Sequence, residues 1–415
     1  MVLLHKATIE KYSVLLKNFS YLSILEVVKL LFPLITIPFL INKLGAFNYG
    51  TVAFVQSIMA YATIIINLGL DLSSVKDISC NRENKAKLDE IVSSVLIIKF
   101  TLFSVICISV FLLTYLIPFF ISNKLLIMFS LSYCLMEIVF PVWYYQGTEK
   151  MKYITWVRLI AVIIYSLLVL CFIKYQDDYL YVPVFYGIGA LCGGIFSFYI
   201  LTKKEKIRLY LPKMKTLVYY LKSTLVLFLS RLSAVINTTF AKIISGIFLG
   251  MEQVALLDLL DKITSIAKIP LVTINNAVYP YIARTKDKKI ARRLFKVTIG
   301  VSVFINVIIF FAADFILGYF SDGMFNEYSY LLQLFSFSIV ICGLSYFLGT
   351  PVLVSFGHSR YFTMSVLSST ILLFILYLFA IMSGLTVVYC ILISLIVEIF
   401  VLLFRYICCK KEAIL

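Results

Sequence analysis

The feature that most constrains this chain is a series of long apolar runs separated by short polar connections. A helix needs about 20 apolar residues to cross a bilayer, and runs of that length recur along the whole sequence. Each run therefore predicts a transmembrane helix, about twelve in all. The runs fall roughly at 19–41, 51–71, 91–117, 124–145, 153–175, 181–201, 223–249, 254–281, 294–317, 328–355, 362–382 and 387–407.

The composition excludes a soluble domain and a disulfide-rich or metal-binding scaffold. Hydrophobic residues make up 62% of the chain and charged residues 14%, whereas soluble domains are about half apolar and a quarter charged. The nine cysteines are an odd number, and none has the paired spacing of a metal site. The sequence thus predicts an all-α polytopic membrane protein without a metal or cofactor.

The net charge of +16 is distributed as a topology signal. Basic connections alternate along the chain with connections that contain few Lys or Arg residues. The positive-inside rule then places both termini and every basic connection in the cytoplasm, so a nucleic-acid partner is not expected. The basic set includes Lys76, Arg82, Lys203, Lys204, Lys206, Arg284, Lys288, Arg360, Arg405, Lys410 and Lys411.

The longest polar stretch divides the predicted helices into two sets of six. We expect an N-terminal lobe at 1–202, a cytoplasmic linker at 203–222 and a C-terminal lobe at 223–415, arranged around a central cavity. The outer connections are all short. They leave no outer domain to hold a catalytic site, so the chain is not expected to be an enzyme.

Ionisable residues lie deep in three of the predicted spans. Such a residue costs about 2.5–3.5 kcal/mol at the middle of a bilayer. In the seventh span Arg231, Thr238 and Lys242 recur on one helical face. The first span contains Glu26 and Lys29, and the eighth contains Asp258, Asp261, Lys262 and Lys268. Lys99 is ambiguous, and Glu137 and Glu398 are isolated acids that could hydrogen-bond between helices.

Two interpretations of these charges remain open. Pairs that hold helices together suit Glu26 with Lys29 and Asp258 with Lys262, each within one helical turn. They suit Arg231, Lys242 and Lys268 less well, because nearby cations outnumber acids. We therefore predict that these three cations, with Lys29 as a weaker fourth, line a cavity and bind a phosphate group. The acids Glu26, Asp258 and Asp261, with Lys262, balance charge or carry a coupling ion.

Several local motifs resemble the O-antigen flippases of the polysaccharide transporter family (Wzx type), which shares a superfamily with multidrug extruders. Their order along the chain is more specific than any one of them. They are Pro33-Leu-Ile-Thr-Ile-Pro38 with Leu44-Gly45 and Tyr49-Gly50, Asn67-Leu-Gly69, Pro141-Val-Trp143-Tyr-Tyr145-Gln146-Gly147-Thr-Glu149-Lys150-Met151, and Asp261-Lys262-Ile263 leading to Tyr279-Pro280-Tyr281-Ile282-Ala283-Arg284.

The resemblance implies a flippase that moves undecaprenyl-diphosphate-linked oligosaccharide across the bacterial inner membrane by alternating access. Its partners would be that substrate, membrane lipids, and a polysaccharide polymerase with chain-length proteins. Two alternatives stay open. A multidrug or small-solute antiporter of the same superfamily needs fewer buried cations. A polysaccharide polymerase or ligase usually needs a large outer loop. ATP is not expected to drive transport, because phosphate-binding loops are absent from the sequence.

Overall fold

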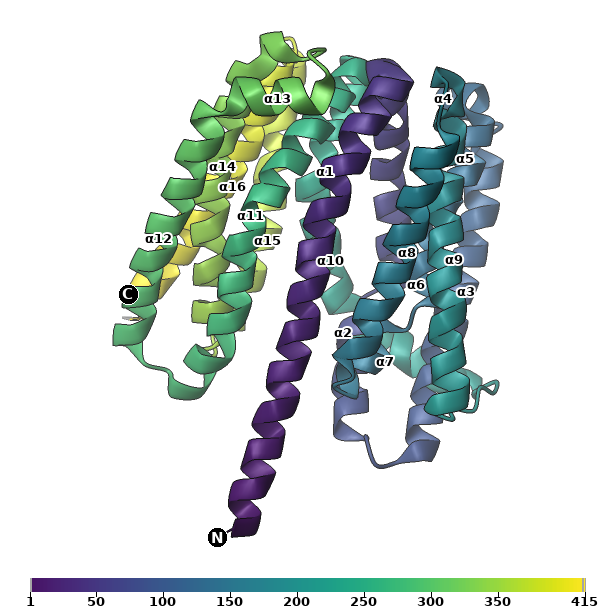
Figure 1. Ribbon diagram of the computed structural model, residues 1–415, viewed down its shortest axis with the longest axis vertical. Helices are drawn as coiled ribbons and strands as arrows, with labels where there is room; N and C mark the ends of the chain where they lie inside the picture. Colours follow the sequence, from purple (N-terminus) through teal and green to yellow (C-terminus); the bar gives the residue numbers. More distant parts are fainter. Residues whose placement is uncertain (1, 413, 415) are drawn as a thin grey trace. The chain divides into compact units, whose positions relative to one another are not determined.

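The computed structural model (Figure 1) describes the backbone of residues 2–412 and 414, and the side chains of 32–222, 224, 228–279, 281–412 and 414. The described chain is helical and contains no strand, which confirms the predicted all-α fold. The first half comprises α1 (Val2–Asn67), α2 (Leu70–Cys80), α3 (Lys85–Leu113), α4 (Pro118–Ser122), α5 (Lys124–Ser130), η1 (Leu131–Cys134), α6 (Leu135–Val139), α7 (Val142–Gly147), α8 (Met151–Phe172), η2 (Gln176–Tyr181), α9 (Val182–Tyr199) and η3 (Ile200–Lys204).

The second half is built from longer helices. Its elements are α10 (Met214–Phe248), α11 (Met251–Thr285), α12 (Lys288–Phe311), α13 (Ala313–Ser321), η4 (Asn326–Tyr328), α14 (Ser329–Phe347), η5 (Leu348–Val354), α15 (Ser359–Met382) and α16 (Val387–Lys411). The first helix begins well before the apolar run at 19–41, and α10 begins inside the stretch predicted as a linker.

Nine helices of the described part of the chain are long and apolar enough to cross a membrane. One of them, Phe32–Cys80, covers two predicted spans. The predicted spans in α10 and α11 are not among the nine, and both contain several charged residues. The chain is therefore a multi-pass membrane protein, and the number of twelve spans stays a prediction.

The long helix α1 breaks at Gly45, where φ is 75° and ψ is 165°. Only glycine adopts that region of backbone space easily. Beyond the break, α1 packs tightly against the start of α11: a Cβ atom on Gly50 would lie 1.8 Å from the carbonyl oxygen of Met251. A Cβ atom on Gly246 would likewise lie 2.2 Å from the Phe54 ring. These glycines therefore allow residues beyond Gly45 to contact α10 and α11 closely.

The chain forms two compact units. Unit 1 contains residues 1–36 and 58–231, and unit 2 contains residues 37–57 and 232–415. These boundaries differ from the predicted lobes, because 37–57 packs with the C-terminal helices and because the division falls inside α10. The lobes at 1–202 and 223–415, with a linker between them, stay a prediction.

The core of unit 1 lies where α2, α3, α7 and α8 pack together at one end of the unit. Trp143, Tyr144 and Tyr145 are buried in it. Three connections meet at this end. Arg82 pairs with Glu149 at 2.7 Å, Lys150 pairs with Glu205, and the Arg208 amide donates to Asp89 at 3.0 Å. Basic connections that the sequence predicts on one side of the membrane thus lie at one end of this unit.

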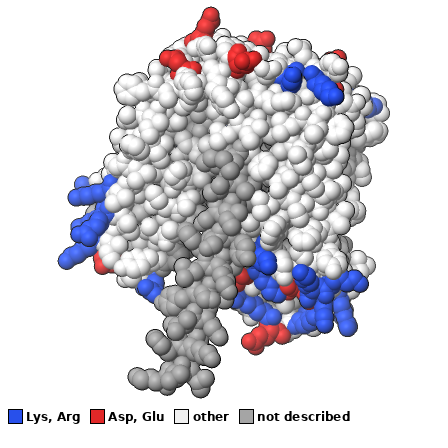
Figure 2. All heavy atoms as spheres, in the orientation of Figure 1, with Lys and Arg blue, Asp and Glu red and all other residues white. Residues whose placement is uncertain are grey.

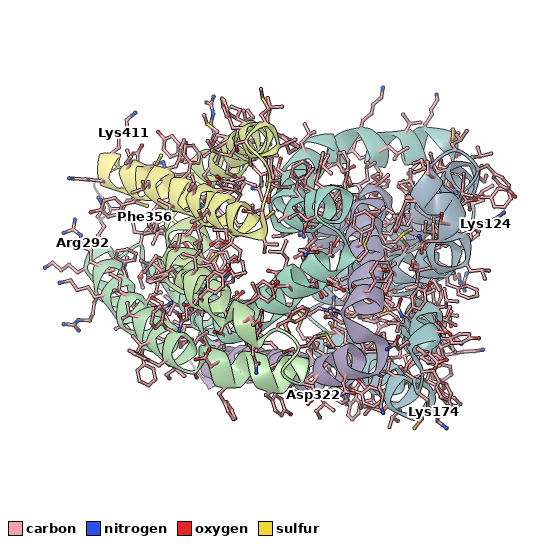
Figure 3. The ribbon with its side chains drawn as sticks, turned by 90° about the horizontal axis from the view of Figure 1, so that it is seen from above. Lys124, Lys174, Arg292, Asp322, Phe356 and Lys411 are labelled. Carbon is pink, nitrogen blue, oxygen red and sulfur yellow. The ribbon has the colours of Figure 1, made fainter. Side chains whose placement is uncertain are left out.

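Unit 2 shows the same arrangement. Its basic connections meet the C-terminal end, where Arg292 donates to the Ile414 carbonyl at 3.4 Å and Tyr361 donates to Glu412 at 3.2 Å. Figure 3 shows Arg292 and Lys411 at the same edge of the unit. In each unit the charged side chains gather toward the ends and leave a broad uncharged band (Figure 2). That band is the surface expected of a helix bundle that faces lipid.

Candidate functional site

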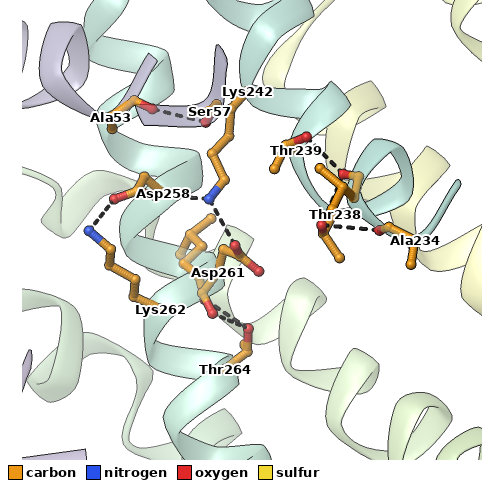
Figure 4. A network of polar contacts seen from close by, with 12 residues as sticks. Ala53, Ser57, Ala234, Thr238, Thr239, Lys242, Asp258, Asp261, Lys262 and Thr264 are labelled. Carbon is orange, nitrogen blue, oxygen red and sulfur yellow. Dashed lines mark hydrogen bonds and ion pairs between the residues drawn. The ribbon is translucent and has the colours of Figure 1, made fainter. Parts of the chain in front are cut away.

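A tight turn brings the charged residues of α10 and α11 together. The turn passes through Gly250, whose φ of 107° suits glycine. Because the two helices run back along each other from this turn, Lys242 on α10 faces Asp258 on α11 (Figure 4). The sequence alone does not predict this pair, because the pairing depends on the position of the turn.

Asp258 is the centre of the network in Figure 4. It is 2% exposed, and its carboxylate accepts from Lys242 at 2.9 Å, from the Tyr49 hydroxyl at 2.8 Å and from Lys262 at 2.7 Å. Lys242 also pairs with Asp261 at 2.9 Å. Lys262 in turn donates to the Tyr49 hydroxyl at 2.9 Å. The network therefore joins two lysines to two aspartates and is balanced in charge.

This geometry corrects the premise on which Lys242 was predicted to bind phosphate. Nearby acids are not too few for Lys242, because two carboxylates contact it. The predicted pair of Asp258 with Lys262 does form, one helical turn apart. Removing one partner of a buried ion pair destabilises a protein by about 3–5 kcal/mol. The network therefore holds α10 against α11.

Lys268 has fewer carboxylate partners than Lys242. It is 8% exposed, and its ammonium lies 4.0 Å from Glu398 on α16 and 5.8 Å from the centre of the Phe335 ring. A separation of 4.0 Å is the longest at which two groups count as an ion pair. Glu398, which the sequence presents as an isolated acid, is therefore the loosely held partner of Lys268.

The other predicted cations and acids lie elsewhere. Arg231 is exposed on α10, and within the described part of the chain no acid pairs with it. Thr238 donates to the backbone of its own helix. Glu26 and Lys29 lie outside the residues whose side chains the structure describes, so their predicted roles stay predictions.

Unit 1 contains a second network, in which Glu137 forms the hydrogen bond between helices that the sequence offers as one interpretation. Lys99 is 1% exposed and pairs with Asp71 at 2.7 Å and with Glu137 at 3.2 Å. The amide of Asn67 donates to both carboxylates, at 2.6 and 2.8 Å. Four side chains from α1, α2, α3 and α6 thus converge. Lys99 and Glu137 each interrupt an apolar run, which is a sequence signal, but nothing in the spacing indicates which charges meet.

The charge pattern of the sequence places Arg405 in the basic C-terminal connection, and this prediction is wrong. The residue lies within α16 and is 4% exposed. The expectation failed because Arg405 is close in sequence to Lys410 and Lys411, which the structure leaves exposed at the helix end. No group of His, Cys, Asp and Glu that could hold a metal ion is found among the described side chains.

Comparison with known proteins agrees with the motifs noted in the sequence. Residues 15–286 match a family described as polysaccharide biosynthesis protein. Two proteins named "Putative O-antigen transporter" are similar over part of their length. The one from Shigella dysenteriae is 26% identical over 67% of this chain and 70% of its own. The one from Escherichia coli (strain K12) is 24% identical over 65% of each chain.

Solved structures share the fold. An inward-facing multidrug resistance transporter of the MATE family and MOP superfamily has a TM-score of 0.73 at 13% identity, covering 94% of this chain and 98% of that one. The lipid II flippase MurJ in an inward closed conformation has a TM-score of 0.71 at 16% identity, covering 94% and 87%. These structures show the shared fold, and the match over residues 15–286 shows that the chain belongs to the polysaccharide biosynthesis protein family.

Proposed function

We propose that this chain is a flippase that moves undecaprenyl-diphosphate-linked oligosaccharide from the inner to the outer leaflet of a bacterial plasma membrane. Family membership and the names of the two relatives support transport of a polysaccharide precursor. The single structural observation that carries the proposal is Lys268, a buried cation on α11 with one acid of the described chain, Glu398, at 4.0 Å. An anion that crosses a low-dielectric region needs such a counter-charge.

We assign different roles to the predicted site residues. Lys268 and Arg231 are the cations that contact the diphosphate. Lys242, Lys262, Asp258 and Asp261 form the charge-balanced network and hold the helices that present Lys268. In this proposal the chain binds and releases its substrate without a chemical reaction. Its termini lie in the cytoplasm, and a polysaccharide polymerase and chain-length proteins act on the delivered product.

Deletion of the gene in the organism that carries it tests this proposal. Surface polysaccharide should be lost, and lipid-linked oligosaccharide should accumulate in the inner membrane. A plasmid copy should restore the surface polymer. Unchanged surface polysaccharide in the deletion strain would contradict the proposal.

Substitutions then test the assigned cations. Lys268→Ala and Arg231→Ala should fail to restore surface polysaccharide at normal protein level, and Arg231→Lys should restore part of it because the charge remains. Lys206→Ala and Lys288→Ala, in exposed connections, are matched controls that should behave as the unaltered chain. The multidrug antiporter remains the alternative, and it would gain if all four alanine variants were equally active while drug resistance fell on deletion.

A further inference from the structure

Unit 2 contains a cavity of about 530 Å³ between α10, α11, α14, α15 and α16. Its volume is within the range of about 300–1,000 Å³ that is usual for small-molecule sites. Much of the wall is apolar, formed by residues such as Val272, Val366 and Val401. Arg405, Glu398 and Asn275 also line it. The cavity therefore offers an apolar chamber with a few polar groups, which is the usual character of a ligand site.

Arg405 is the most unusual residue of this wall. Its Nε donates to the Ser365 hydroxyl at 3.0 Å, and its Nη1 donates to the carbonyl and the hydroxyl of Ser345 at 2.8 and 3.1 Å. The guanidinium also lies 4.5 Å from the centre of the Phe362 ring. Among the described residues no acceptor contacts Nη2 and no carboxylate pairs with Arg405. The serines thus orient the guanidinium but leave its charge and two of its N–H donors without a partner.

The charge around the cavity is not balanced. Arg405 and Lys268 contribute two positive charges, and Glu398, which Lys268 approaches at 4.0 Å, contributes one negative charge. One positive charge therefore remains, and it resides on a side chain that is 4% exposed. A buried charge without a counter-ion is expensive, so the wall is complementary to an anion.

Asn275 is a second, independent indication of a ligand. It is 6% exposed, it lines the cavity, and neither its amide nitrogen nor its amide oxygen has a hydrogen-bond partner among the described residues. Buried polar groups are nearly always hydrogen-bonded in folded proteins. A ligand that accepts from the Asn275 amide nitrogen and from Arg405 would give both of these donors a partner.

The backbone beside Arg405 is shaped to leave room for its side chain. Residues Leu348–Val354 form a turn of π-helix that contains Pro351, and such turns occur frequently at functional sites. Within it, a Cβ atom on Gly349 would lie 2.7 Å from Nη1 of Arg405. Any larger residue at 349 would displace the guanidinium from its present position.

We propose that this cavity binds the phosphate end of an amphipathic anion, with the phosphate at Arg405 and Asn275 and the first part of its apolar chain along the valines. The identity of the anion rests on the proposed function: it is the diphosphate lipid that carries the oligosaccharide. The two free N–H groups on Nη2 of Arg405 can donate charge-assisted hydrogen bonds to phosphate oxygens. The substrate-binding residues then include Arg405, which the sequence analysis did not select.

Binding of radiolabelled farnesyl diphosphate to the purified full-length protein in neutral detergent tests the proposal. We expect saturable binding that Arg405→Gln weakens at least tenfold and Arg405→Lys weakens less. Asn275→Ala should weaken it several-fold, and since that amide has no hydrogen bond to lose, this variant should fold normally. Gly349→Ala should also weaken binding while the charge is retained. Arg360→Gln, on the exposed start of α15, is the matched control and should bind as the unaltered chain.

Competition identifies the source of the anion. Inorganic diphosphate should compete weakly, and farnesol and dioctanoyl phosphatidylglycerol should compete poorly, because the site needs both a diphosphate and an apolar chain. Equal competition by phosphatidylglycerol would overturn the assignment to the substrate lipid. Absence of binding to the unaltered chain, or binding that Arg405→Gln and Asn275→Ala leave unchanged, would overturn the site.

The inference and the proposed function fail in different ways. If deletion of the gene abolishes surface polysaccharide but Arg405→Gln binds farnesyl diphosphate normally, the inference is wrong and the flippase function stands. If deletion leaves surface polysaccharide intact while binding depends on Arg405, the function is wrong. The assignment of the anion to the substrate lipid is then overturned with it.

Discussion

At the scale of single residues, the buried charges of the chain differ in how fully neighbouring groups compensate them. Asp258 accepts from three donors and is fully compensated, whereas Arg405 is fixed by two serines and keeps an uncompensated charge. The first arrangement is suited to holding helices together, because every buried group has its partner. The second is suited to binding, because a ligand completes it.

Asp258→Asn should destabilise the protein far more than Asp261→Asn. Asp258 is buried and serves Lys242, Lys262 and Tyr49, so its neutralisation should cost about 3–5 kcal/mol. Asp261 has a side chain that is 36% exposed and contacts only Lys242 in this network, so the same change should cost about 1 kcal/mol or less. Thermal unfolding of the two variants in the same detergent provides the comparison.

A double variant separates charge balance from ion transport by Asp258. If Asp258 only balances charge, replacing Asp258 and Lys262 together should reduce protein level less than replacing Asp258 alone. If the double variant instead accumulates normally but transports no better than the worse single variant, Asp258 takes part in the transport step.

At the scale of whole elements, small residues decide which helices pack closely. Gly50→Ala should destabilise the protein by about 3 kcal/mol or more, because its Cβ atom would lie 1.8 Å from backbone of α11 and one helix would have to shift. Gly300→Ala on α12 is the matched control. No atom from elsewhere in the described chain lies within 4 Å of its added Cβ atom, so it should stabilise the protein by about 0.5–1 kcal/mol. Unfolding temperatures that fall equally for both variants would contradict this account of the packing.

The sequence predicts elements better than it predicts contacts between them. The apolar runs indicate the helices, and the spacing of Asp258 and Lys262 indicates a pair, because both signals are local. The contacts of Lys242 with Asp258, and of Lys99 with Asp71 and Glu137, join different helices. Their formation depends on the turn at Gly250 and on the packing of α2, α3 and α6, which no local pattern encodes.

The position of Arg405 shows a further limit of sequence reasoning. An arginine five residues before a pair of exposed lysines fits the basic end of a helix as well as it fits a buried site. What buries it is the packing of α14, α15 and η5 around α16, with Ser345 and Ser365 as acceptors. The predicted span 124–145 is likewise not one regular helix: a tighter turn at Leu131–Cys134 interrupts it, and Phe140 and Pro141 separate α6 from α7.

At the scale of the whole molecule, the alternation of basic and non-basic connections predicts one orientation in the membrane. Reporter fusions at Lys206 and Lys288 should read on the cytoplasmic side, and fusions at Gln176 and Gly323 on the outer side. Within unit 1 the contacts of Arg82, Lys150 and Arg208 already bring three basic connections to one end. A cytoplasmic signal at Gly323 would contradict the assignment for the second half.

The division of the chain into two units has a mechanical consequence. The polypeptide passes from one unit to the other at residues 36–37, 57–58 and 231–232, and each passage lies inside α1 or α10. The links are therefore helical and are not flexible loops. Any displacement of one unit would have to bend these helices. Pro33 and Pro38 flank the first passage, and each removes a backbone donor. Each missing hydrogen bond makes a helix easier to bend at that point, so the stiffness of 33–38 would govern the force that a displacement between the units requires.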